Sequence, residues 1–428
     1  MYFLVICAVF LATFLSPAWS QESSMGAMDM KGMKMNEQET LQLPSPHAGS
    51  GTAWEPASVP EHEWMLMRGG WELMAHGQIF IDYNQQGGPR GGGAKAESVN
   101  VGMLMEQHPL GRGTILLREM LSAESLTSPH PGFPELFQTG ETYHGVALID
   151  HQHPHNVFGE LSALYLLPLS TKISWELYGG PSAEPALGPV TYIHRTSASE
   201  LPLAPLGHHL QDSTHTSFGV ITTGFIIERV KLEGSAFNGR EPNEQRWSIQ
   251  LAALDSWSGR ASVAPGRDWT AQYSVGRLEH PEALEPGSQW RQTASVEYNR
   301  PLPDGNWATS VVWGRVHKIE TGTNLNGYLL ESTLNFLRRD YAFTRIELVD
   351  KDELFPQAAL HPAYRIGAYT FGGVRDLMQN RAWQLGLGAD VTLYSKPAAL
   401  DAAYGNYPVS FQIFLRMRPG KQTSEHHR

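Results

Sequence analysis

Apolar and polar side chains alternate in many segments between residues 65 and 418. In residues 383–393 every second residue is apolar, and the residues between them are polar or glycine. In residues 409–418 Val, Phe, Ile, Leu and Met alternate with mostly polar residues in the same way. Because successive side chains of a β-strand point to opposite faces, this period of two predicts strands with one apolar and one polar face.

About sixteen segments of this kind follow one another, and each has close to the ~10 residues that a strand needs to cross a bilayer. The predicted strands lie near residues 71–83, 97–107, 112–124, 155–167, 171–179, 213–227, 229–238, 246–261, 268–279, 289–299, 305–318, 325–337, 340–350, 363–376, 381–394 and 407–418. Short turns alternate with longer connections between them. We therefore predict an all-β fold, a transmembrane antiparallel β-barrel over residues 65–418.

A soluble β-sandwich or jelly roll also has alternating strands and is the alternative. A sandwich closes with few strands, whereas this chain carries many of similar length. In bacterial barrels the short turns face the periplasm and the long loops face outward. The turn pattern therefore predicts a protein of the outer membrane, in contact with its lipid, with both chain ends in the periplasm.

The two ends of the chain differ from the barrel. Residues 1–20 contain a short apolar run that ends in Ala18-Trp19-Ser20, which is typical of a cleaved signal peptide. Residues 21–64 lack a periodic pattern and predict a flexible periplasmic arm, and residues 419–428 predict a polar tail. The only cysteine, Cys7, lies in the signal peptide, which excludes disulfides and thiolate ligands from the mature chain.

Composition limits the partners. The net charge is −11. An acidic chain is not expected to bind nucleic acid, whose phosphates would repel it.

Five methionines stand close together in the predicted arm. Thioether sulfur is a soft ligand that selects Cu(I), and a segment without a core gives methionine no packing role. The cluster therefore predicts a copper site in the arm, and biased composition without a function is the alternative. The residues are Met25, Met28, Met30, Met33 and Met35.

Histidines are concentrated in the middle of the chain. The sharpest group is His151, His153 and His155, separated by single residues. On an extended chain such imidazoles share a face and could chelate Zn, Cu or Ni, with Asp150 as an oxygen ligand. The alternative is a set of hydrogen-bonding loop residues.

Two long connections, 125–154 and 180–212, are candidates for segments that fold into the barrel. The second is rich in Pro and Gly, which fix the course of a loop. Its polar residues would line a constriction. Ser213, His215 and Asp212 together suggest a hydrolase, but neighbours in sequence rarely form a catalytic triad, whose members converge from separate elements. The candidate lining residues are Glu184, His194, Arg195, Asp212 and His215.

The motifs DHQHPHNVFGE (150–160), YGGPSAEPALGP (178–189), GHHLQDSTH (207–215) and FNGREPNE (237–244) resemble those of an uncharacterised family of exported bacterial proteins. That resemblance implies no activity. In its plan, a Met- and His-rich arm before a barrel, the chain is also similar to the outer-membrane copper-resistance B proteins. No barrel residue carries over from them, so this likeness is an analogy of organisation.

These observations predict a non-enzymatic outer-membrane barrel that binds or passes a transition metal, most plausibly copper. Such an arm would exchange ions with a periplasmic metal carrier. Two other functions remain open: a general or solute-specific porin without a metal role, and an enzyme that acts on envelope lipid or glycan at the barrel rim.

Overall fold

The computed structural model describes residue 44 and residues 49–285, 287–357 and 361–421. The chain divides into two compact units, Met1–Leu41 and Gln42–Arg428, and all of the described residues belong to the second. The predicted signal peptide and the methionine cluster at 25–35 lie outside the described residues, as do the last seven residues of the predicted tail.

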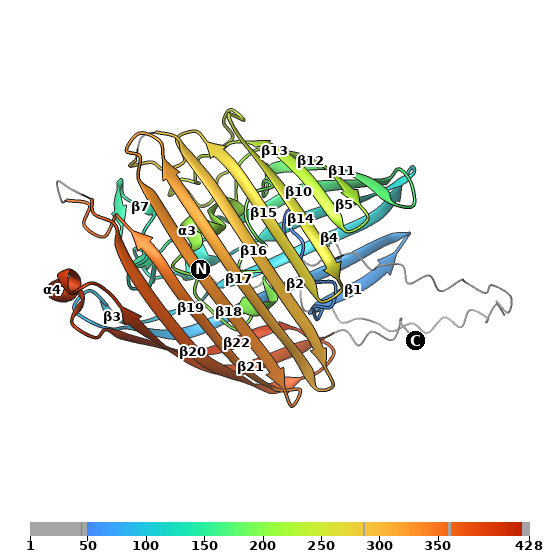
Figure 1. The fold of residues 1–428 in the computed structure, drawn as a ribbon. Coiled ribbons are helices and arrows are strands. Elements are labelled where there is room, and N and C mark those ends of the chain that lie inside the picture. Colours follow the sequence, from blue (N-terminus) through green and yellow to red (C-terminus); the bar gives the residue numbers. More distant parts are fainter. Residues whose placement is uncertain (1–43, 45–48, 286, 358–360, 422–428) are drawn as a thin grey trace. The chain divides into compact units, whose positions relative to one another are not determined.

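Sixteen antiparallel strands form a closed barrel (Figure 1), so the predicted fold is confirmed. The ring closes where β2 pairs with β22. The strands are β2 (Trp71–Gln86), β3 with β4 (Gly93–Glu97 and Asn100–Leu110), β5 (Gly113–Leu121), β10 (Phe158–Pro168), β11 (Ile173–Ser182), β12 (Val220–Ile227), β13 (Val230–Phe237), β14 (Ser256–Gly266), β15 (Trp269–Leu278), β16 (Gln289–Leu302), β17 (Gly305–Lys318), β18 (Asn324–Phe336), β19 (Asp340–Lys351), β20 (Tyr364–Gln379), β21 (Trp383–Ser395) and β22 (Val409–Pro419).

Two pairings at β2 need explanation. Strands β3 and β4 pair with successive parts of β2 and together occupy one position in the ring. Strand β1 (Glu63–Arg68) pairs with the first half of β2 through a turn at Gly69 and Gly70. Both glycines have positive φ, 61° and 84°, a conformation that side chains with a Cβ adopt at a cost.

Short and long connections alternate around the ring, as the sequence predicts. One end has tight turns, such as Gly111–Arg112 and Asp304 with Pro303, and the other end has the long connections. Two predicted strands begin 7 and 10 residues later than expected, whereas the boundaries of the other strands agree to within three residues. The segment 213–227 begins in a 3-10 helix, η2 (Ser213–His215), and becomes a strand only at Val220. The segment 246–261 is an irregular connection up to residue 255, so its strand lies at Ser256–Gly266.

Side chains follow the predicted parity. On β21, Leu387 and Leu393 face outward with 47% and 46% of their surface exposed, whereas Gln384 on the same strand is fully buried. On β22, Ile413 is 50% exposed and Arg416 is buried. Aromatic rings also gather near the tight turns, where Trp269, Tyr298 and Trp307 contact one another across three neighbouring strands in tilted and edge-to-face arrangements. Such belts mark the membrane–water interface in barrels.

Three segments fill the interior. They are residues 49–62, the connection 122–157 (the first inner loop) and the connection 183–219 (the second inner loop), which lies within the ring of strands in Figure 1. The first inner loop contains α2 (Glu124–Thr127), β6 (Phe133–Pro134), β7 (Glu141–Tyr143), β8 (Val146–Leu148) and β9 (His151–Gln152). The second contains η1 (Thr196–Ala198), α3 (His208–Gln211) and η2; the β21–β22 connection contains η3 (Ala398–Leu400) and α4 (Asp401–Tyr404).

Residues 49–62 correct one expectation, because they belong to the segment predicted to be a flexible arm. Lys231 donates a hydrogen bond to the carbonyl oxygen of Thr52, and Glu55 accepts one from the Thr196 backbone at 2.6 Å. Asn299 donates to the carbonyl oxygen of Ser58 at 2.6 Å. These polar contacts with the inner wall and the second inner loop fix the segment in place. Across the described residues, helices are all too short or too polar to cross a membrane.

Candidate functional site

The second inner loop crosses the lumen and contacts the wall on several sides. The backbone N–H of Gly188 donates to Ser274 Oγ on β15 at 2.9 Å. Ser197 Oγ donates to Ser310 Oγ on β17 at 2.7 Å, and Gly207 N–H donates to Glu347 on β19 at 3.0 Å. On the opposite side of the ring from β15, Gln78 on β2 donates a hydrogen bond to the Ser199 carbonyl oxygen at 2.6 Å, so the loop spans the lumen and obstructs it.

Buried charges anchor this loop to the wall. Arg195 Nε donates to Glu331 on β18 at 2.8 Å, and Arg345 on β19 donates to the other oxygen of the same carboxylate at 2.8 Å. Glu200 in the loop contacts Arg416 and, at 3.0 Å, Arg418, both on β22. All six side chains are almost fully buried. Removing one partner of such a pair is costly, because it leaves an uncompensated buried charge.

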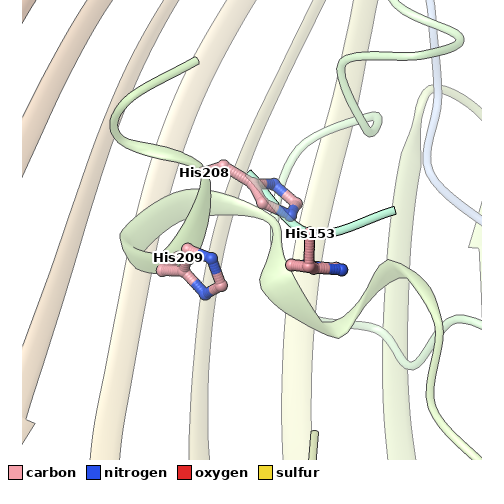
Figure 2. Close-up of side chains that lie close together, drawn as sticks. All are labelled: His153, His208 and His209. Carbon is pink, nitrogen blue, oxygen red and sulfur yellow. The ribbon is translucent and has the colours of Figure 1, made fainter. Parts of the chain in front are cut away.

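Five histidines meet where the two inner loops touch, and we call them the histidine cluster. Three of them, His153, His208 and His209, each have one ring nitrogen within 4.8 Å of the others. Figure 2 shows these three side chains gathered at α3. The rings of His155 and His215 lie 5.2 Å apart, and those of His208 and His215 lie 5.0 Å apart.

Carboxylates orient most of these rings. His208 Nδ1 bonds Asp212 Oδ1 at 2.5 Å, His155 Nδ1 bonds Glu124 at 2.7 Å, and His153 Nε2 contacts Glu141. Two buried ring nitrogens, His209 Nδ1 and His215 Nε2, have no hydrogen-bond partner. Imidazoles held by carboxylates, with other nitrogens left over, are the arrangement found around borderline divalent metals. Rotation of His153 away from Glu141 would be needed to complete such a site.

Burial controls the charge of the cluster. It lowers the pKa of His153 to about 4, and it lowers the pKa of His209 and His215 well below the usual histidine value, helped by neighbouring His208. Burial also acts on His155, but its interactions with Glu124 outweigh burial and raise its pKa. For Asp212, burial is outweighed by His208, which lowers its pKa to about 2. At neutral pH several of these imidazoles therefore keep their lone pairs.

Of the three histidines singled out from the sequence, His153 and His155 belong to the histidine cluster, with ring centroids 6.4 Å apart, and His151 does not. His153 turns toward His208 and His209, and His155 turns toward Glu124 and His215. His151 lies apart, with its Nδ1 bonded to the carbonyl oxygen of Ile149 at 2.9 Å. Sequence spacing alone could not show this, because the partners of His153 come from a different loop.

A serine hydrolase arrangement is not formed around Ser213. The Ser213 hydroxyl oxygen accepts a hydrogen bond from Arg291, while His215 Nδ1 donates to the backbone carbonyl of Asp212 at 2.9 Å. The Asp212 carboxylate is directed to His208 instead. Ser213, His215 and Asp212 thus serve the packing of the second inner loop.

A cavity of about 770 Å³ opens at the end of the barrel with the long connections. Its described lining includes six glutamates and neither lysine nor arginine; the glutamates are Glu141, Glu241, Glu244, Glu282, Glu285 and Glu353. Two of them reach the histidine cluster, since Glu141 contacts His153 and Glu241 lies 3.6 Å from His209. The cavity therefore borders the cluster. Arg246 and Arg291 pair with Glu141 and Glu241, but the six glutamates outnumber these cations, so the lining favours cations.

Three of these glutamates, Glu282, Glu285 and Glu353, lie close enough together to hold a metal ion. A cation is already beside them, however. The ammonium of Lys318 contacts Glu285 and lies 3.8 Å from Glu353 and 2.9 Å from Asp352. This group is better described as a partly neutralised part of the cavity wall.

Comparison with known proteins identifies the fold. No protein-family model and no curated protein sequence matches this chain. Among solved structures it is similar to an anion-selective porin from Comamonas acidovorans, with a TM-score of 0.52 and 10% identity over 81% of this chain and 99% of that one. It is also similar to OmpF of Salmonella typhi in complex with daunomycin, with a TM-score of 0.51 and 9% identity over 83% and 100%.

A third similar structure is OprB of Pseudomonas putida at high pH, with a TM-score of 0.51 and 8% identity over 82% of this chain and 94% of that one. At such identities the likeness establishes the fold of an outer-membrane porin and no function. None of these matches supports the similarity in plan to copper-resistance B proteins.

Proposed function

We propose that this protein is a narrow outer-membrane channel that favours cations, with the second inner loop as its constriction. The observation that carries the proposal is the course of that loop across the lumen, fixed to the wall by the ion pairs of Arg195 and Glu200. The porin fold supports a channel, and the acidic cavity above the histidine cluster supports a preference for cations.

Removing the constriction tests the proposal. Ala183 and Ser217 exchange two backbone hydrogen bonds, of 3.0 and 2.9 Å, at the ends of the loop. Residues 184–216 can therefore be replaced by an Asn-Gly turn without moving β11 or β12. In planar bilayers we expect the full chain to show low, cation-favouring conductance in a KCl gradient, and the shortened chain to conduct several-fold more.

A matched control removes residues 251–254 from the β13–β14 connection. These residues are exposed, with Leu251 at 64% and Leu254 at 41%, so their loss should leave conductance unchanged. Equal conductance of the full and shortened chains would show that the loop is not the constriction. A reversal potential that favours chloride would overturn the cation preference.

Copper binding by the arm remains a prediction from the sequence, because Met25, Met28, Met30, Met33 and Met35 lie outside the described residues. A peptide of residues 21–40 titrated with Cu(I), beside a version with the five methionines changed to leucine, tests it. The porin alternative drawn from the sequence is better supported than a metal role, because the similar solved structures are porins. The second inner loop, which contacts opposite sides of the lumen, favours a narrow porin over an open one.

A further inference from the structure

Four methionines face the lumen at one place on the wall, where polar side chains are the rule for a porin-like barrel. They lie on three adjacent strands and all are buried, with at most 2% of their surface exposed: Met74 on β2, Met103 and Met105 on β4, and Met120 on β5. Their neighbour Leu104 points the other way and is 44% exposed. The parity of the strands thus directs the thioethers inward.

The register of the sheet places a row of imidazole and thioether side chains next to one another. His76 on β2 is directly opposite Met103 on β4, and Met103 is directly opposite Met120 on β5. The second inner loop places His194 over this row. The ring centroids of His76 and His194 are 5.5 Å apart.

Each imidazole meets a thioether. His76 Nε2 lies 3.1 Å from Met103 Sδ, and His194 Nε2 lies 3.3 Å from Met120 Sδ. Thioether sulfur is a weak hydrogen-bond acceptor but a soft metal ligand. Metal–ligand bonds of about 2.0–2.3 Å place two donors on one tetrahedral ion roughly 3.3–3.8 Å apart. The two nitrogen–sulfur distances are close to that spacing.

From this geometry we propose that His76, His194, Met103 and Met120 form a binding site for a soft monovalent metal ion, Cu(I). Two neutral nitrogens and two thioethers form a donor set that suits Cu(I) and gives a harder ion such as Zn²⁺ little advantage. The site is distinct from the histidine cluster, where carboxylates surround the imidazoles, and it does not depend on ion conduction through the barrel.

An ion has access to this row. A cavity of about 120 Å³ is lined by His76, Met103 and His194, together with the carboxylates of Glu55 and Glu61.

The experiment measures Cu(I) binding by the purified mature chain in detergent, with ascorbate present and bicinchoninate as the competing chelator. To separate the two methionine groups, the starting protein carries leucine at Met25, Met28, Met30, Met33 and Met35. We expect this variant to retain one equivalent of Cu(I). Adding Met103→Leu and Met120→Leu should weaken binding at least tenfold, and excess Zn²⁺ should not displace the ion.

The matched control adds Met65→Leu and Met67→Leu, which remove two thioethers from exposed positions on β1, 46% and 64% exposed. Methionine-to-leucine changes nearly conserve volume, so both variants should fold, as heat-modifiable mobility on gels can confirm. X-ray absorption should find nitrogen and sulfur neighbours in the control, and His194→Gln should reduce the nitrogen signal. Absence of Cu(I) from the starting variant, or equal affinity of the Met103/Met120 and Met65/Met67 variants, would overturn the site.

Discussion

At the scale of single residues, the side of the strand decides what a substitution costs. Leu387 and Gly388 are neighbours on β21, but the first faces lipid and the second faces the lumen. From parity alone, a large polar residue at Gly388 should destabilise the barrel less than the same residue at Leu387. The structure removes that expectation, because a Cβ at Gly388 would lie 2.4 Å from the Phe414 ring and 2.7 Å from Val374.

We expect Leu387→Arg to destabilise the barrel by about 2–4 kcal/mol, since it places a charge in the apolar belt near the middle of the strand. Tyr407→Arg is the control, because Tyr407 is 89% exposed in the β21–β22 connection and its replacement should have little effect. Urea unfolding in lipid vesicles measures both. Equal midpoints for the two variants would mean that Leu387 is not in the membrane.

At the scale of elements, the second inner loop has little regular structure of its own and depends on the wall. Its helices η1, α3 and η2 are three or four residues long, too short to be stable alone. What fixes them is burial and charge pairing, above all the two arginines on Glu331. The loop should therefore be as protected as the strands while these pairs are intact.

Replacing Arg195 by methionine tests this dependence. The change leaves Asp212, 3.5 Å from Arg195, without that partner and should cost about 3–5 kcal/mol. Hydrogen exchange should become faster across residues 190–215. The control is Arg338→Met, which removes a surface pair with Asp304 and should cost at most about 1 kcal/mol. Unchanged exchange in the Arg195 variant would show that the loop is held by its apolar contacts alone.

At the scale of the whole molecule, the segments that fill the lumen contain buried acidic side chains. Burial raises the pKa of Glu184 and of Glu135 to about 8, and that of Glu55 to about 7. Each lies in a different inner segment. Nearby Glu160 and Asp212 raise the pKa of Glu184 further, while Ser50 and Arg260 oppose the rise.

Because these pKa values are raised in the folded state, the stability that they contribute is present below about pH 4.5 and is lost as the pH rises through 7–8. The inner segments should therefore loosen in mild alkali, and single-channel conductance should be higher at pH 9 than at pH 6. Glu184→Gln keeps the neutral form at all pH values and should reduce this increase. Glu244→Gln changes a partly exposed acid whose pKa is lowered mainly by a hydrogen bond from the Gly145 backbone N–H, and it should not reduce the increase. A conductance independent of pH would refute the explanation.

The sequence by itself determined the barrel. Which face each side chain takes in segments such as 383–393 can be predicted from the neighbouring residues alone, because successive side chains of a β-strand point to opposite faces. Connection lengths then fixed the direction of successive strands. The predicted strand boundaries were wrong where the local pattern was ambiguous. Residues 213–219, for example, have polar side chains that fit a strand facing water, but they belong to the second inner loop.

Only the tertiary structure decided what lies inside the barrel. The loops carry no periodicity, and their partners are remote in the chain: Arg195 meets Glu331, and His153 meets His208 and His209. Met103 and Met105 flank Leu104 in an unbroken apolar run, which hides their inward direction. His76, Met103 and Met120 come together through strand register, and His194 joins them only when its loop crosses the lumen. Such convergence depends on long-range contacts, which a pattern of near neighbours does not encode.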